Sequence, residues 1–111
     1  MPNELAGKKC IPCRGDTPPL WAEQADEMLG RLGSGWSFDE NRHLVKRFRF
    51  KNFQQALEFA NKVGALAENE GHHPEIHIGW GRVVIELWTH AINGLSENDF
   101  IMAAKIDMLI V

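Results

Sequence analysis

The stretch that decides the fold is a predicted β-hairpin, and it reads Ile76-His77-Ile78-Gly79-Trp80-Gly81-Arg82-Val83-Val84-Ile85-Glu86-Leu87-Trp88-Thr89-His90. Residues 76–80 and 83–90 are short runs rich in β-branched and apolar side chains, which favour strands. Gly79 and Gly81 bracket the junction between the two runs, as a tight turn requires. The sequence therefore predicts two antiparallel strands joined by a short turn.

A second hairpin is predicted upstream, from residues 36–39 and 43–50, with residues 40–42 between the strands. Leu44, Phe48 and Phe50 share one face of the longer strand, as the two-residue period of a strand requires. Lys46 interrupts that apolar face.

Three helices are predicted around the two hairpins, over residues 20–32, 53–69 and 97–109, from apolar residues spaced three and four apart. Asn52 can cap the second helix, and Ser96 with Asp99 resembles a capping box at the start of the third. The inner face of the second helix is predicted to carry Phe53, Ala56, Leu57, Ala60, Val63 and Gly64.

The element order is therefore α-β-β-α-β-β-α, which predicts an α+β fold: a four-stranded antiparallel sheet with helices packed on one face. The other face of the sheet and the apolar C-terminus, residues 108–111, would then need cover. Self-association is the simplest source of that cover.

Composition limits the class of protein. The 111 residues suit one domain, and 12 Lys+Arg against 15 Asp+Glu give a formal charge of −3. This acidic balance argues against direct nucleic-acid binding driven by bulk charge. No apolar run approaches the roughly 20 residues that span a bilayer, and the N-terminus has no signal-peptide core. A cytoplasmic protein without membrane contact is expected.

Both cysteines lie in one short motif, Cys10-Ile11-Pro12-Cys13, inside a predicted N-terminal leader over residues 1–19 that precedes a domain over residues 20–111. A zinc half-site or a redox pair would suit the spacing, but each lacks its usual partners. Reduced loop thiols without chemistry are the favoured interpretation. Zinc shared across an oligomer or with a histidine is the alternative.

The most informative run is His72-His73-Pro74-Glu75, where Pro74 disfavours helix and so ends the second helix near the histidines. If the hairpin turn centres on Gly81, His72 faces His90 across the strands; if it centres between Trp80 and Gly81, His73 faces Trp88 instead. In both registers three imidazoles gather at one end of the hairpin. No Tyr is present in the chain, so imidazoles and carboxylates are left to move protons.

Three clustered imidazoles suit general acid–base catalysis, because imidazole exchanges protons near neutral pH. Two alternatives stay open: the histidines end a helix and a strand without chemistry, or His72, His73 and His90 bind zinc or iron. His43 and His77 are expected to be surface or packing residues.

Other side chains near the histidines have structural alternatives. Glu68 lies one helical turn before His72, so the two can touch, although a solvated carboxylate is as ordinary there. Asp99 can serve as a helix cap alone. Trp80 and Trp88 can stack on a planar ligand or pack in a core or interface.

The combined pattern resembles the pterin-4a-carbinolamine dehydratase family. The resemblance runs from about Leu20 to the C-terminus and rests on Glu68-x-x-x-His72-His73-Pro74-Glu75, on Thr89-His90, and on Gly94-Leu95-Ser96-Glu97-x-Asp99. The leader Cys10-x-Pro12-Cys13-Arg14-Gly15 resembles the longer N-termini of some bacterial and plant members. Gly71 stands where many members have Asp or Asn, and Trp88 where mammalian members have a small polar residue.

The resemblance implies a lyase that dehydrates 4a-hydroxytetrahydrobiopterin to the quinonoid dihydropterin, in tetrahydrobiopterin biosynthesis and recycling, with no metal or organic cofactor. It implies catalytic roles for His72, His73 and His90. His72 and His90 would share the acid and base roles while His73 holds the pterin. Substrate contacts are implied for Glu68, Pro74, Trp88, Thr89 and Asp99.

Family members are dimers or tetramers, so the resemblance implies a homodimer or homotetramer. The mammalian member also works as a coactivator bound to a transcription factor. A protein-interaction module on the same fold, with little catalysis, is therefore the alternative function.

Overall fold

The computed structural model of the chain describes residues 4–8, 18–32 and 35–110. Its elements, in chain order, are η1 (Glu4–Gly7), α1 (Ala22–Arg31), β1 (Ser37–Phe38), β2 (Leu44–Arg49), α2 (Phe53–Glu70), β3 (Glu75–Gly79), β4 (Arg82–Leu87), η2 (His90–Ile92) and α3 (Glu97–Met108). The predicted Cys10–Cys13 motif lies outside the described residues, so the leader and its boundary at residue 19 stay predictions.

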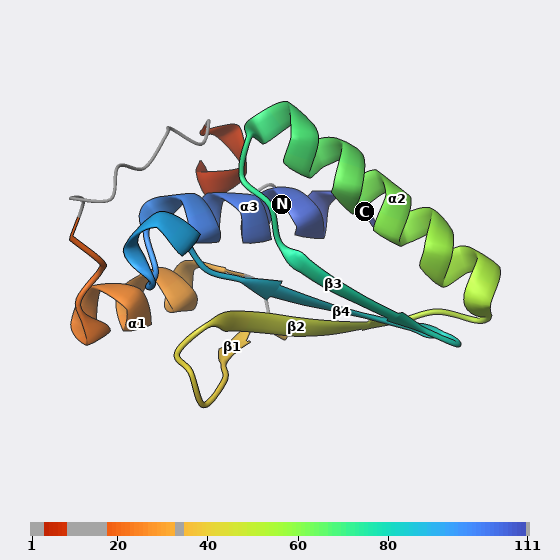
Figure 1. The fold of residues 1–111 in the computed structure, drawn as a ribbon, viewed down its shortest axis with the longest axis horizontal. Helices are drawn as coiled ribbons and strands as arrows, with labels where there is room; N and C mark the ends of the chain where they lie inside the picture. Colours follow the sequence, from red (N-terminus) through yellow and green to blue (C-terminus); the bar gives the residue numbers. More distant parts are fainter. Residues whose placement is uncertain (1–3, 9–17, 33–34, 111) are drawn as a thin grey trace.

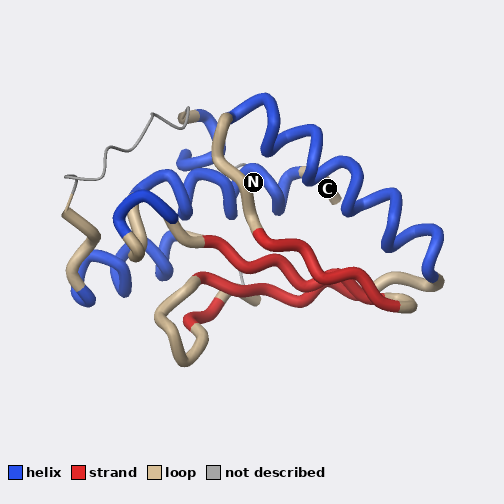
Figure 2. The backbone as a smooth tube through the Cα atoms, in the orientation of Figure 1, coloured by secondary structure: helices blue, strands red, loops and turns tan. Residues whose placement is uncertain are grey.

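The four strands form one antiparallel sheet in the order β1-β2-β4-β3 (Figure 1). Helices α2 and α3 lie on one side of this twisted sheet, and no helix of the described residues lies on the other side in front of β2, β4 and β3 (Figure 2). The predicted α+β architecture is confirmed. Within the described ranges, no helix is long and apolar enough to cross a membrane.

The turn between β3 and β4 fixes the register that the sequence left open. Gly79 pairs with Arg82, so Trp80 and Gly81 alone form the turn. Gly81 has φ +69°, and a Cβ added there would lie 3.0 Å from the Phe50 carbonyl oxygen, so glycine is strongly favoured. Continued to the open end of the hairpin, this register brings His73 level with Trp88, the second of the two predicted alternatives.

The inner face of the sheet is apolar along its two central strands. Leu44 and Phe48 of β2 pair with Leu87 and Val83 of β4, and all four side chains are buried. Lys46 interrupts this apolar face as predicted, and it forms an ion pair. Its Nζ lies 2.8 Å from Asp107 Oδ1 near the end of α3. The core therefore tolerates this lysine because its ammonium has a partner.

Helix α2 begins as predicted at its Asn52 cap, whose side-chain oxygen accepts the Gln55 backbone N–H at 2.8 Å. Its inner face differs from the prediction, and the buried residues are Ala56, Phe59, Ala60, Val63 and Ala67. Phe53 and Leu57 were expected inside but are exposed, because the buried stripe follows the i, i+3, i+4 spacing from Ala56 through Phe59.

Helix α3 is the centre of the core. Every residue from Asn98 to Ala104 is buried, since the helix lies between the sheet and η1. Leu5 of η1 is fully buried against this helix. Part of the segment before residue 20 therefore completes the core of the domain.

The outer face of the sheet is less apolar than expected. Its side chains alternate with the buried ones and include the exposed Arg47, Arg49 and Arg82 and the partly buried Glu86. Apart from Ile78 on the edge strand β3, the exposed large apolar side chains lie at helix, helix-end and turn positions: Trp21, Phe53, Leu57, Trp80, Met108 and Ile110. This distribution means that the sheet face itself does not demand an apolar partner.

Candidate functional site

The end of α2 separates the two neighbouring histidines. Gly71 adopts the left-handed conformation, with φ +68° and ψ 25°, and both its N–H and that of His72 donate to the Ala67 carbonyl, at 2.9 and 3.3 Å. Glycine adopts this left-handed conformation without the steric cost of a Cβ, so Gly71 suits the turn. The turn stops the helical periodicity, and His72 and His73 consequently find different partners.

His72 is held by the most buried polar group in the site. Its Nε2 lies 2.6 Å from Asp99 Oδ1; the histidine side chain is 11% exposed and the aspartate side chain 0%. An ionised carboxylate only accepts hydrogen bonds, so Nε2–H donates and Nδ1 carries the lone pair of the neutral ring. Among the described residues, Nδ1 of His72 has no hydrogen-bond partner.

Asp99 also joins His72 to the end of β4. Its second oxygen, Oδ2, accepts the Thr89 hydroxyl and the Ser96 backbone N–H, each at 2.9 Å. Thr89 Oγ1 lies 2.7 Å from Ser96 Oγ, and both side chains are buried. The capping-box prediction is confirmed, and the same carboxylate both starts α3 and orients the His72 ring.

His73 pairs with Glu68, at 2.5 Å between Nε2 and Oε2. The contact that the helical spacing allows between Glu68 and His72 does not form, because the turn at Gly71 ends the helix before the i+4 position. Both side chains are mostly exposed, 60% and 77%, so this pair is solvated and weakly held. Pro74 follows His73 directly and leads the chain into β3.

The sequence predicts that the strand extends to His90, but the strand ends before it. β4 ends at Leu87, Thr89 bridges to Gly94, and His90 begins the short helix η2. This loop closes because Asn93 takes a left-handed conformation with φ 48°. Its imidazole is exposed and stacks on Trp88 with ring centroids 4.2 Å apart.

His43 belongs to the same surface, although sequence reasoning left it out. Its ring lies nearly parallel to Trp88, with centroids 4.1 Å and planes 5° apart, and its Nδ1 is 2.6 Å from Glu86 Oε2. The position could have been found from the strand register alone, since His43 lies directly opposite Trp88 beyond the Leu44–Leu87 pair. Trp88 thus contacts two imidazoles. His77 lies on the outer face of β3, as expected of a surface residue.

One group of described residues has the ligand types and spacing for a metal ion: Asp39, His43 and Glu86, whose ligand atoms lie within 4.8 Å of one another. These atoms already satisfy each other and the backbone. Asp39 Oδ1 accepts hydrogen bonds from the backbone N–H groups of Asn41 and His43, and Glu86 Oε2 contacts Nδ1 of the His43 ring. The hydrogen bonds of the hairpin therefore account for the positions of these three side chains. His72, His73 and His90 form no such group within the described residues.

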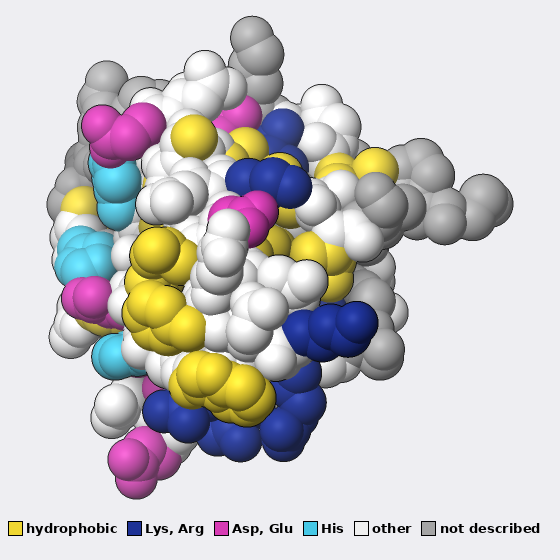
Figure 3. Space-filling model, turned by 90° about the vertical axis from the view of Figure 1, so that its right-hand side faces the viewer, with side chains coloured by type: hydrophobic (Ala, Val, Ile, Leu, Met, Phe, Trp, Pro, Cys, Tyr) yellow, Lys and Arg dark blue, Asp and Glu magenta, His cyan; other side chains and the backbone are white. Residues whose placement is uncertain are grey.

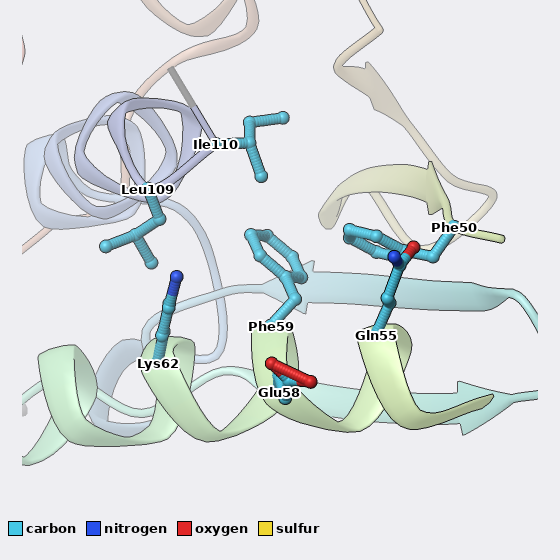
Figure 4. Close-up of a pocket in the computed structure, with 7 residues that line it drawn as sticks. All are labelled: Phe50, Gln55, Glu58, Phe59, Lys62, Leu109 and Ile110. Atoms are coloured by element: carbon cyan, nitrogen blue, oxygen red, sulfur yellow. The ribbon is translucent and has the colours of Figure 1, made fainter. Parts of the chain in front are cut away.

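Figure 3 shows the end of the molecule that carries the β3–β4 turn, with Lys and Arg side chains gathered low on this face and His beside Asp and Glu along one edge. A separate groove of about 410 Å³ lies between α2 and the end of α3 (Figure 4). Phe50, Phe59, Leu109 and Ile110 form its apolar part and Gln55, Glu58 and Lys62 its polar part. None of the predicted site residues lines this groove.

The comparisons with known proteins agree with one family. The family "Pterin 4 alpha carbinolamine dehydratase" matches residues 18–109. A protein of Rickettsia bellii named "Putative pterin-4-alpha-carbinolamine dehydratase" is 52% identical over 105 residues, covering 95% of this chain and 93% of its own. The protein of the same name from Rubrobacter xylanophilus is 51% identical over 107 residues, covering 96% and 99%.

Two solved structures share the fold. The transcriptional coactivator/pterin dehydratase from Brucella melitensis superposes with a TM-score of 0.76 at 34% identity, covering 82% of this chain and 97% of its own. A pterin dehydratase-like protein described as a RuBisCO assembly factor in the alpha-carboxysome gives a TM-score of 0.58 at 32% identity, covering 68% and 88%.

Proposed function

Because the chain belongs to the pterin 4 alpha carbinolamine dehydratase family, we propose that it removes water from a 4a-hydroxytetrahydropterin. The substrate class implied by the family is 4a-hydroxytetrahydrobiopterin, and the product is the quinonoid dihydropterin. This reaction would place the chain in the synthesis and recycling of reduced pterins.

The observation that carries the proposal is the buried pair of His72 and Asp99. A carboxylate that holds one ring nitrogen fixes the tautomer and leaves the other nitrogen to exchange a proton with a substrate. Thr89 and Asp99 are buried, so they support this ring, whereas Glu68, His73 and Pro74 lie where a ligand can reach them.

The dehydration is redox-neutral. The C4a–O bond breaks with its electron pair on oxygen, a proton is added to the departing hydroxyl, and water leaves. The N5–H proton is lost, and its electron pair forms the N5=C4a double bond. One acid and one base are therefore required.

His72 suits the base, because its Nδ1 holds the lone pair while Nε2–H is committed to Asp99. His90 suits the acid, because its ring is exposed and no described residue occupies its ring nitrogens, which leaves an N–H for the substrate. His73, beside Glu68, would hold the bound pterin.

The experiment generates the 4a-hydroxy compound in a rapid mixer and follows its decay by absorbance, with and without substoichiometric protein. Acceleration of the first-order decay supports the proposal. No acceleration, even with stoichiometric protein, contradicts it.

A second candidate function is protein binding, favoured by the exposed apolar side chains Phe53, Leu57, Met108 and Ile110. The coactivator and assembly-factor names of the two similar structures belong to those proteins and lend support to this candidate. Self-association into a dimer or tetramer would use the same kind of surface. Light scattering during size-exclusion chromatography tests this, and a clean 12.6 kDa monomer contradicts it.

A further inference from the structure

Trp88 is the residue whose surroundings differ most from a ligand-stacking role. Its indole stacks with His43 on one neighbouring strand and with His90 two residues along its own chain. Each imidazole covers part of the indole that a planar ligand would need. We propose that Trp88 and His43 are positioning residues that orient the His90 imidazole, an inference that rests on the dehydratase function proposed above.

The argument begins with His90 itself. A group that transfers a proton must be held close to its reaction geometry, because a displacement near 1 Å costs up to about 10²-fold in rate. His72 is held in place by Asp99, whereas the imidazole of His90 has no hydrogen bond to any described residue. The stack on Trp88, at 4.2 Å and 29°, is what restrains its exposed ring.

The indole is in turn held from the β2 side. The His43 ring lies parallel to it at 4.1 Å, and His43 is fixed by its Nδ1 contact with Glu86 and by its backbone N–H bond to Asp39 Oδ1 at 2.8 Å. The His43 side chain is 15% exposed, so the ring has little freedom to move. The hairpin loop therefore fixes the His43 ring, the His43 ring supports the Trp88 indole, and the indole restrains the His90 ring.

This arrangement predicts which substitutions matter. Trp88→Phe keeps an aromatic face for His90, whereas Trp88→Ala removes it. His43→Phe keeps the support of the indole without the Glu86 contact, whereas His43→Leu removes the stacked ring. Trp80→Ala is the matched control, because Trp80 is 73% exposed at the other end of the same hairpin.

The test measures kcat and KM by stopped flow and, in parallel, the carbon-bound proton shifts of the His90 ring by NMR. Trp88→Ala should lower kcat by roughly 10- to 100-fold with KM little changed. Its His90 ring protons should lose the upfield ring-current shift caused by the indole. Trp88→Phe should retain most of both, His43→Leu should lose a smaller part of both, and Trp80→Ala should change neither.

Wild-type kcat in Trp88→Ala with unmoved His90 signals would overturn the inference, as would an equal loss in Trp88→Phe and Trp88→Ala. If Trp88→Ala does not fold, His43→Leu against His43→Phe makes the same comparison with the indole in place. A wild-type protein without dehydratase activity contradicts the proposed function, and the NMR shifts still decide whether the stack orients His90.

Discussion

The two ends of the β3–β4 hairpin carry side chains of opposite charge, with arginines at the turn and glutamates at the open end. At the turn, Arg49 lies directly opposite Arg82, and neither forms an ion pair with another described residue. At the open end, Glu86 lies directly opposite Glu75, but Glu86 has the His43 ring as its partner. Like charges therefore face each other at both ends. Only at the open end does one of the charged side chains, Glu86, have a partner among the described residues.

The two ends also differ in burial, because the buried polar contacts of the hairpin lie at its open end. The turn is closed by a glycine and leaves its charged and aromatic side chains in solvent. The open end buries Asp99, Thr89 and Ser96 in one hydrogen-bonded group beside His72. Buried, fully bonded polar groups next to partly exposed imidazoles are typical of a catalytic site, whereas unpaired surface arginines are typical of a solvated face.

The largest contrast is expected in catalysis. His72→Ala should lower kcat by roughly 10²-fold or more, the usual contribution of a general acid or base. Arg82→Ala at the turn should leave kcat unchanged. Stopped-flow decay of the 4a-hydroxypterin measures both, and equal rates in the two variants would remove the functional distinction between the ends.

Asp99→Ala should be the most destabilising change at the open end. It leaves the Thr89 hydroxyl, the Ser96 N–H and the His72 ring without their acceptor, a loss of roughly 2–3 kcal/mol in the free energy of unfolding. Urea denaturation measures it. Asp99→Asn retains the size and one acceptor oxygen, which can still accept from Thr89 and Ser96 while the amide NH2 faces His72. It should therefore lose less stability while altering the His72 tautomer; equal stability losses in the two variants would contradict this assignment.

Gly81→Ala should affect the turn end without touching catalysis. The left-handed φ and the nearby Phe50 carbonyl should cost about 1–2 kcal/mol in the free energy of unfolding. The kcat of the folded fraction should match wild type. A loss of kcat comparable to that of His72→Ala would show that the two ends are coupled, against the separation described above.

Arg49→Gln should have the smallest effect, a gain of about 0.2–1 kcal/mol from relief of the repulsion with Arg82. The gain should shrink at high salt, because the charges are exposed. Thermal unfolding at low and high ionic strength measures it. A destabilised Arg49→Gln would mean that the arginine has a partner on the sheet.

Much of this fold is local and so follows from the sequence. Asn52 and Asp99 cap their helices as their positions predict, and the element order needs only periodicity and turn residues. The hairpin register could not be chosen, because Gly79 and Gly81 permit either centre. In the structure Gly79 pairs with Arg82, and Gly81 lies against the Phe50 carbonyl on a third segment.

The sequence supplied the candidate site residues but not the contacts between them. His72, His73 and His90 were identified from spacing and resemblance, yet the His72–Asp99 contact joins residues 27 positions apart through tertiary packing. Helical spacing allowed Glu68 to contact His72, but it pairs with His73, since helical spacing fails beyond the left-handed Gly71. His43 was set aside because strand pairing, and no local motif, brings it to Trp88.

The most direct test of the central claim compares wild type with the His72→Ala/His90→Ala double variant in the same 4a-hydroxypterin decay assay, with folding checked by circular dichroism. The wild-type protein should accelerate the decay, and the folded double variant should return it to near the uncatalysed rate. A double variant that accelerates the decay as well as wild type would contradict the assignment of this end of the hairpin as the catalytic site.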